Sequence, residues 1–174
     1  MFTAGNILHG KFQLKAEKKN KYAVVLYNDR GKCVLATYTT SKPRSGTLSV
    51  VHGKNPPNSP TPHSYVFKKG NVIGVCNNGT VSADFSFSVD TTVVPDYGYT
   101  MTTPPEFESN VDDLRVVCKL LDNEYYELIY TLYKSKKTSN KYKKIFESIL
   151  EMKYGALSQW CTIYLRDNIS IMRI

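Results

Sequence analysis

The chain has 174 residues, of which 41% are hydrophobic and 22% charged, which excludes a wholly disordered protein and provides enough apolar material for one folded domain. The net charge of +8 is concentrated in residues 1–105, which contain 12 Lys and Arg against 5 Asp and Glu, whereas residues 106–174 contain 11 against 10. The apolar runs are too short for a transmembrane helix, and residues 1–14 lack the apolar region of a signal peptide. We therefore predict a cytoplasmic protein with no membrane partner.

Short antiparallel strands are predicted between residues 7 and 94. Two apolar runs, residues 22–27 and 33–38, are joined by Asn-Asp-Arg-Gly at 28–31, which favours a tight turn. Residues 81–88 alternate apolar and polar side chains, as in a half-buried strand. Further strands are predicted at 47–51, 64–67 and 71–76, with a hairpin turn at Lys69 and Gly70 and a type I′ turn at Asn78 and Gly79.

Prolines interrupt this pattern twice. Residues 53–62 contain four prolines, which excludes a central strand and predicts an exposed loop. Pro104 and Pro105 are predicted to divide the chain into a β-barrel domain at 1–104 and a helical extension at 105–174.

After residue 105 the apolar spacing becomes helical. One helix is predicted to start at a cap formed by Ser109 or Asn110, and a second to run from Ser139 to Gly155. A third, short helix is predicted near residues 157–164, with a strand as the alternative. The apolar residues of the first helix are Leu114, Val117, Cys118, Leu121, Tyr125, Leu128, Ile129 and Leu132. The fold class is therefore predicted as α+β, a small antiparallel β barrel followed by a C-terminal helical segment.

The sequence shows no motif for a metal, a cofactor or a nucleophile. The four cysteines, Cys33, Cys76, Cys118 and Cys161, are widely spaced without a CxxC pair, which argues against a zinc site and a disulfide framework. We predict reduced, buried thiols. Phosphate-binding glycine loops and hydrolase motifs are also missing, so neither a metal nor a cofactor is expected.

Basic residues gather near the predicted turns of the strand region. They are Lys15, Lys18, Lys19 and Lys21, followed by Lys42 and Arg44 next to the hydroxyls of Thr39, Thr40 and Ser41. Basic loops at one end of a barrel attract phosphates, although solvated surface lysines explain the pattern equally well. Of the three histidines, His63 is the best candidate for acid–base chemistry, because it follows the rigid proline loop.

The order of these segments is informative. Gly5-Asn6-Ile7 opens the first strand and Lys21-Tyr22 the second, Thr39-Thr40-Ser41 ends the third, and Pro62-His63 follows a variable loop. Over residues 5–67 this order resembles the Kid/PemK/MazF family of endoribonuclease toxins. The resemblance implies an SH3-like barrel that cleaves single-stranded RNA without a metal, and it implies a homodimer and an antitoxin protein as partners.

The resemblance also implies site residues. The family's catalytic arginine corresponds to Lys21 and its catalytic hydroxyl to Thr39, with Thr40 as the alternative. Lys21 would stabilise charge on the scissile phosphate, Thr39 would orient it, and His63 would act as acid or base. The remaining RNA-binding residues are predicted to be Lys18, Lys19, Thr40, Ser41, Lys42 and Arg44. Because lysine replaces arginine, a non-catalytic nucleic-acid-binding barrel and a protein-interaction module stay open as alternatives.

Overall fold

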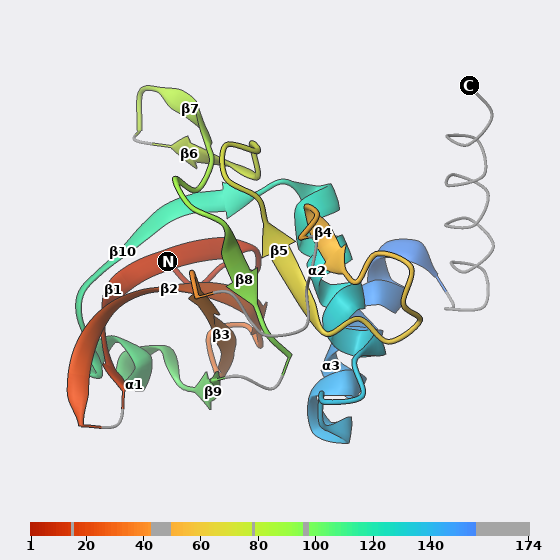
Figure 1. The fold of residues 1–174 in the computed structure, drawn as a ribbon. Coiled ribbons are helices and arrows are strands. Elements are labelled where there is room, and N and C mark those ends of the chain that lie inside the picture. The colour runs from red at the N-terminus through yellow and green to blue at the C-terminus, as the bar shows by residue number, and fades with distance from the viewer. Residues whose placement is uncertain (15, 43–49, 78, 96–97, 156–174) are drawn as a thin grey trace.

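A computed structural model describes residues 1–14, 16–42, 50–77, 79–95 and 98–155. Within these residues, ten strands form one sheet and three helices accompany it (Figure 1). The strands are β1 (Asn6–Leu14), β2 (Glu17–Asn28), β3 (Val34–Thr40), β4 (Gly53–Asn55), β5 (Ser64–Phe67), β6 (Gly74–Asn77), β7 (Ser82–Phe85), β8 (Thr91–Val93), β9 (Tyr99–Thr102) and β10 (Val111–Leu120). The helices are α1 (Pro104–Ser109), α2 (Asp122–Lys134) and α3 (Asn140–Tyr154).

The strands follow the order β4-β5-β8-β3-β2-β1-β10-β6-β7, and β9 pairs with β3 beside this path. All of these pairings are antiparallel. The end strands β4 and β7 do not pair with each other in the described part of the chain, so the sheet is open there. The predicted antiparallel strands and C-terminal helical segment are confirmed, a closed barrel is not seen, and the SH3-like form stays a prediction.

The helix predicted to start at Ser109 or Asn110 is wrong over residues 111–120, which form β10. This strand pairs along β1, from Val111 opposite Phe12 to Lys119 opposite Asn6, and therefore belongs to the same sheet as the earlier strands. Two register shifts interrupt the pairing. The apolar side chains of β10 consequently do not alternate regularly, and their spacing imitates that of a helix.

Pro104 and Pro105 do not separate strands from helices. They begin the short helix α1, where proline is tolerated because the first N–H groups of a helix lack intrahelical partners. The Thr103 hydroxyl caps this helix by accepting a hydrogen bond from the Glu106 N–H at 3.4 Å. The sheet then continues in β10.

The remaining helical predictions are confirmed by α2 and α3. The helix α2 buries Leu128, Ile129 and Leu132, whose spacing predicted it. The helix α3 follows Ser139 and ends at Gly155, which has a φ of 77° that glycine adopts without strain. Figure 1 shows both helices at the end of the sheet that holds β4 and β5. The third predicted helix, near 157–164, lies outside the described residues.

Two hydrophobic cores cover opposite faces of the central strands. Along β2, Val24 and Leu26 face the main core, which α2 and α3 complete, whereas Ala23 and Val25 face the second core. The second core is closed by α1, which contributes Phe107. Because both faces are covered, this part of β2 is a continuous apolar run rather than an alternating one.

Some predictions for short segments are wrong because strands that are distant in sequence pair with each other. The predicted hairpin at Lys69 and Gly70 is wrong, because β5 pairs with β4 and β8, whereas β6 pairs with β10 and β7. The hairpin around Gly79 is formed by β6 and β7, although Asn78 lies outside the described residues. Of the strand predicted at 81–88, residues 82–85 form β7. Val81, which was expected to face the core, is 63% exposed. The proline segment was predicted to be an exposed loop, but its first residues form β4, an end strand in which Gly53 and Asn55 are buried. Residues 47–49 of another predicted strand lie outside the described part.

The cysteines also differ from the prediction. Cys118 is buried, but Cys33 and Cys76 are partly exposed, and all three are free thiols. Cys161 lies outside the described residues.

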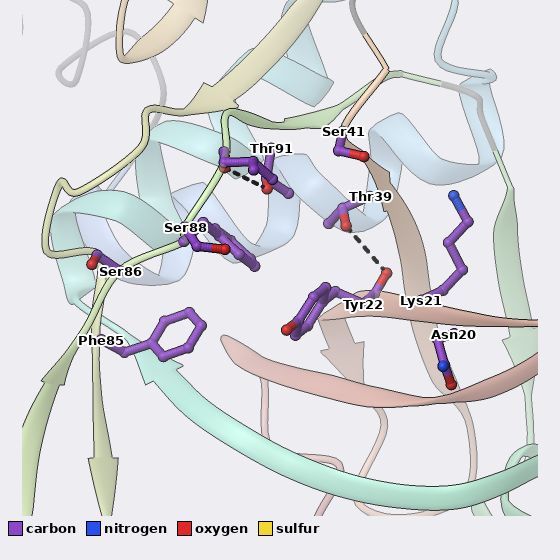
Figure 2. A pocket seen from close by; sticks show the side chains of 11 residues that line it. Asn20, Lys21, Tyr22, Thr39, Ser41, Phe85, Ser86, Ser88 and Thr91 are labelled. Atoms are coloured by element: carbon purple, nitrogen blue, oxygen red, sulfur yellow. Dashed lines mark hydrogen bonds between the residues drawn. The ribbon is translucent and has the colours of Figure 1, made fainter.

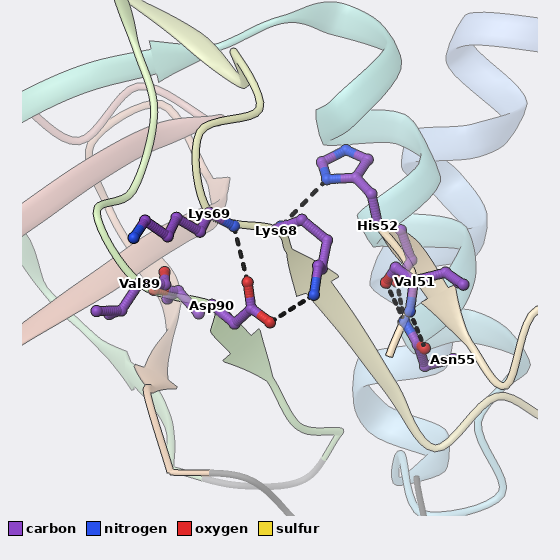
Figure 3. A network of polar contacts seen from close by, with 9 residues as sticks. Val51, His52, Asn55, Lys68, Lys69, Val89 and Asp90 are labelled. Carbon is purple, nitrogen blue, oxygen red and sulfur yellow. Dashed lines mark hydrogen bonds and ion pairs between the residues drawn. The ribbon is translucent and has the colours of Figure 1, made fainter. Parts of the chain in front are cut away.

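A polar network attaches α2 to β4 and β5. Glu124, only 6% exposed, accepts hydrogen bonds from His52 Nε2 and Tyr65 Oη, each at 2.8 Å. His52 Nδ1 accepts from the Lys68 N–H at 3.2 Å (Figure 3), so the proton of the neutral imidazole resides on Nε2. The Lys68 ammonium in turn binds Asp90 at 2.7 Å. Both nitrogens of His52 are thus occupied by hydrogen bonds that connect α2 to the sheet.

Glu127, three residues after Glu124 on α2, should make stability depend on pH. Partial desolvation and then the Glu124 charge raise the pKa of the Glu127 carboxyl. The folded protein therefore binds this proton more tightly than the unfolded chain, so the ionised group destabilises the fold at neutral pH, and the penalty disappears as the pH falls through the raised pKa. We expect Glu127→Gln to be more stable than the wild type at pH 7 and to lose this advantage below the ordinary value of 4.5. Urea unfolding at both pH values tests this, and an advantage independent of pH would contradict it.

Candidate functional site

A polar cleft opens between β2 and the end of β3 on one side and the end of β7 with the segment after it on the other. It has a volume of about 380 Å³. Asn20, Lys21 and Tyr22 of β2 line one side together with Thr39 and Ser41, and residues 85–89 with Thr91 line the other (Figure 2). Hydroxyl groups and aromatic rings are therefore exposed to the same space, which suits a ligand with both polar and flat apolar parts.

The cleft lies on the sheet face that carries the main core and borders this core, to which the lining residue Phe87 belongs. On β1, Ile7 belongs to the core and His9 follows two residues later on the same face. On β2, Val24 belongs to the core and Tyr22 lies two residues before it. Tyr22 lines the cleft, whereas His9 lies opposite Tyr22 on the neighbouring strand and is not among the lining residues.

Strand registers align four residues across this face. Arg115 of β10 lies opposite His9, and His9 lies opposite Tyr22. Since Tyr38 pairs with Ala23, the next position places Thr39 opposite Tyr22. We call Arg115, His9, Tyr22 and Thr39 the cross-strand row. Side chains of directly opposed residues share one face of a sheet, so the row continues from the cleft across β2 and β1 to β10.

Ring contacts hold the middle of the row in place. The ring centroids of His9 and Tyr22 are 4.8 Å apart, and those of Tyr22 and Phe87 are 5.1 Å apart with nearly perpendicular ring planes. Burial, and then the Arg115 charge, lower the pKa of His9. Its Nδ1 atom is buried and has no hydrogen-bond partner among the described residues, which further disfavours a second N–H. His9 is therefore a neutral ring at pH 7, placed between a cation and the cleft.

Two of the three predicted catalytic residues line the cleft. Thr39 is 3% exposed and donates a hydrogen bond to the Tyr22 carbonyl at 3.4 Å. Lys21 also lines the cleft, but strand alternation directs its side chain to the face of Ala23, and Figure 2 shows it extending away from the Tyr22 ring. His63 is exposed at the start of β5, which β8 separates from β3, and it is not among the residues that line the cleft.

The predicted RNA-binding lysines do not form one patch. By strand alternation, Lys18 and Lys19 point to opposite faces of β2. Both are also paired with carboxylates, Lys18 with Asp112 at 2.6 Å and Lys19 with Glu17 at 2.5 Å. Their position and their partners make them weaker candidates for binding phosphates than the sequence suggested.

The predicted hydroxyl turn is only partly available. Thr40 is 5% exposed, and its hydroxyl accepts a hydrogen bond from the Lys42 N–H at 3.2 Å. Ser41 lines the cleft, and the Lys42 side chain is exposed beside it. Arg44 lies outside the described residues.

Sequence reasoning missed Arg115 and ranked His9 below His63. Arg115 is exposed and makes no ion pair with a carboxylate of the described residues, whereas the nearby Lys11 binds Asp113 at 2.9 Å. A signal for His9 exists, since it occupies a position of β1 that faces the core side. For Arg115 no signal existed, because its segment was predicted to be helical.

Comparisons with known proteins identify no relative: no family model, no curated protein and no solved structure matches the chain. The described residues contain no group of three or more His, Cys, Asp or Glu side chains that could hold a metal ion. No helix in this part of the chain is long and apolar enough to cross a membrane. Function must therefore be inferred from the cleft and the cross-strand row.

Proposed function

We propose that the protein binds single-stranded RNA along the cleft and the cross-strand row. The observation that supports this most is the row itself, which aligns the Arg115 cation, the rings of His9 and Tyr22, and the Thr39 hydroxyl on one face. Proteins bind single strands by combining cations that contact phosphates with rings on which bases stack. Three strand spacings cover about 14 Å, which is long enough for more than one nucleotide of a single strand.

Two features favour a single strand over a duplex. Stacking on Tyr22 or on Phe85 of the cleft requires unpaired bases, because the faces of paired bases are covered by their neighbours. The hydroxyls of Thr39 and Ser41 also lie inside a cleft rather than on a convex surface. A flexible single strand can enter this space, whereas a duplex contacts only its rim.

Binding should be strongly salt-dependent. We expect the affinity for a fluorescently labelled, mixed-sequence single-stranded RNA to fall linearly on a log–log plot between about 50 and 200 mM salt, because cations of the protein displace counterions from phosphates. Fluorescence anisotropy measures the affinity, and unlabelled duplex RNA serves as the competitor. An affinity that does not respond to salt, or a duplex that competes as well as the single strand, would contradict the proposal.

Metal-independent RNA cleavage is a second candidate function. It is favoured by the presence of Lys21 and Thr39 at one cleft, since the family resemblance assigns the chemistry to these positions. The binding mixture, incubated in EDTA, separates the two functions. Fragments with 5′-hydroxyl ends would indicate a nuclease, intact bound RNA a binding protein, and a complete lack of binding a protein-interaction module. The toxin role, the antitoxin and the homodimer stay predictions.

A further inference from the structure

Two cysteines from distant parts of the chain face each other across β6 and β10. The register places Gly74 opposite Leu120 and Val75 opposite Lys119, so the next position places Cys76 opposite Cys118. Both side chains point toward the main core, since Cys118 belongs to it and Cys76 packs against it. Directly opposed residues of antiparallel strands have Cα atoms about 4.5–5.5 Å apart. This separation lies within the range of about 4.4–6.8 Å that a disulfide requires.

The two thiols differ in accessibility. Cys76 is partly exposed, whereas Cys118 is 2% exposed, and both are free in the structure. Burial, and then the neighbouring Cys76 thiol, raise the pKa of Cys118 to about 12. An oxidant from solution therefore reaches Cys76 first. Cys118 lies opposite Cys76, where it can attack the product from inside the protein, although slowly because its thiol is mostly protonated.

We propose that Cys76 and Cys118 form a reversible disulfide by exchange with a small-molecule disulfide such as oxidised glutathione. The Cys76 thiolate attacks one sulfur of the reagent, which forms a mixed disulfide and releases one glutathione. The Cys118 thiolate then attacks the Cys76 sulfur and releases the second glutathione. Two protein thiols are oxidised, one reagent disulfide is reduced to two thiols, and the two protons pass to the glutathione sulfurs. The second step is slow near neutral pH and accelerates as the pH rises, because little Cys118 is ionised.

The crosslink would fix the hairpin of β6 and β7 to the rest of the sheet. Within the described residues, β6 pairs with β10 at two positions, and β7 is an end strand. One side of the cleft is formed by Phe85, the last residue of β7, and by residues 86–89, which follow directly. A disulfide between β6 and β10 therefore restricts the segment that shapes the cleft. The inference goes beyond the proposed function and does not depend on RNA binding.

Peptide mapping tests the proposal. The full-length protein is incubated with oxidised glutathione at mildly alkaline pH, alkylated and digested without reductant. Before alkylation, we expect the intact mass of the protein to be reduced by two hydrogens. After digestion, we expect one peptide that links Cys76 to Cys118, and reduction should remove both signals. Cys33→Ser is the matched control, because it removes another partly exposed thiol and should retain the crosslink. Cys76→Ser should lose it while the buried Cys118 stays in place.

Each alternative outcome overturns part of the proposal. A glutathione adduct on Cys76 without a linked peptide would show that Cys118 cannot reach it, and a link to Cys33 or Cys161 would show a different pairing. Hydrogen exchange of the wild type provides a second readout. We expect the amides of residues 74–77 and 82–85 to exchange more slowly in the oxidised protein, and unchanged exchange would overturn the restriction of the hairpin.

Discussion

Replacing Glu124 with alanine is expected to lower the free energy of unfolding by about 2–4 kcal/mol. The carboxylate is the acceptor for two donors, Tyr65 Oη and His52 Nε2, where α2 meets β4 and β5. Each buried donor left without an acceptor costs about 1–3 kcal/mol. The cost of leaving His52 without its acceptor is at the lower end of this range, because the His52 side chain is 25% exposed and can reach water. Urea unfolding followed by circular dichroism measures the change.

Three further variants separate the polar network from other effects of this substitution. Tyr65→Phe removes one of the two donors and should cost less than Glu124→Ala. Glu124→Gln keeps one oxygen acceptor and should also lie between the alanine variant and the wild type. Asp122→Ala removes an exposed carboxylate from the same helix, where it binds Lys153 at 3.2 Å, and should change stability by less than about 0.5 kcal/mol. If Glu124→Ala were no more destabilising than Asp122→Ala, the network would not stabilise the fold.

Elements with local signals were predictable from the sequence. The helix α3 follows Ser139, whose side chain makes no capping hydrogen bond, and it ends at Gly155, whose positive φ glycine adopts without strain. The turn at residues 28–31 is formed in the same way, since the Asn28 side chain accepts a hydrogen bond from the Gly31 N–H at 2.7 Å. The signals that predict both elements are local in the sequence, although α3 also buries Phe146, Ile149 and Leu150 in the main core.

The strand β10 could not be predicted by the same reasoning. Its apolar residues fit a helix, and the decision in favour of a strand comes from β1, about a hundred residues earlier in the chain, whose edge it covers. The same limit applies to the open sheet, because β6 and β7 lie beside β10 rather than beside β5, which precedes them in the sequence. Pairing over long distances overrides local spacing in both cases.

The residues of the candidate site also fall into two groups, those with a local sequence signal and those that only strand pairing brings together. Thr39 was found because it ends a strand that the resemblance marks, and it does line the cleft. Arg115 was not found, because it reaches the row only through the pairing of β10 with β1. His63 was favoured for following a rigid loop, a local property that does not bring its ring to the cleft. The register of the strands decides which residues lie opposite each other, as for Cys76 and Cys118. The spacing of residues along the chain does not predict this register.

Replacing Arg115 with glutamine is expected to weaken binding to single-stranded RNA about tenfold at low salt. Arg115 is the cation at the far end of the cross-strand row, and no carboxylate of the described residues forms an ion pair with it. A hydrogen bond to a charged group contributes about 1.5–3 kcal/mol, and the loss of one phosphate contact should reduce the slope of log affinity against log salt by about 0.7. Anisotropy titrations at several salt concentrations measure both quantities.

The matched control is Lys119→Gln, which removes the same unit charge from the same strand. Lys119 is also exposed, but it lines a different pocket, together with Tyr126 and Lys153. The two variants carry equal net charge. If RNA contacts the cross-strand row specifically, Arg115→Gln should lose much of the affinity for RNA and Lys119→Gln only a little. Equal losses would mean that RNA responds to net charge alone, and an unaffected Arg115→Gln in a protein whose wild type binds RNA would exclude Arg115 from the binding surface. A wild type that binds no RNA would instead refute the proposed function itself, so the two failures are distinguishable.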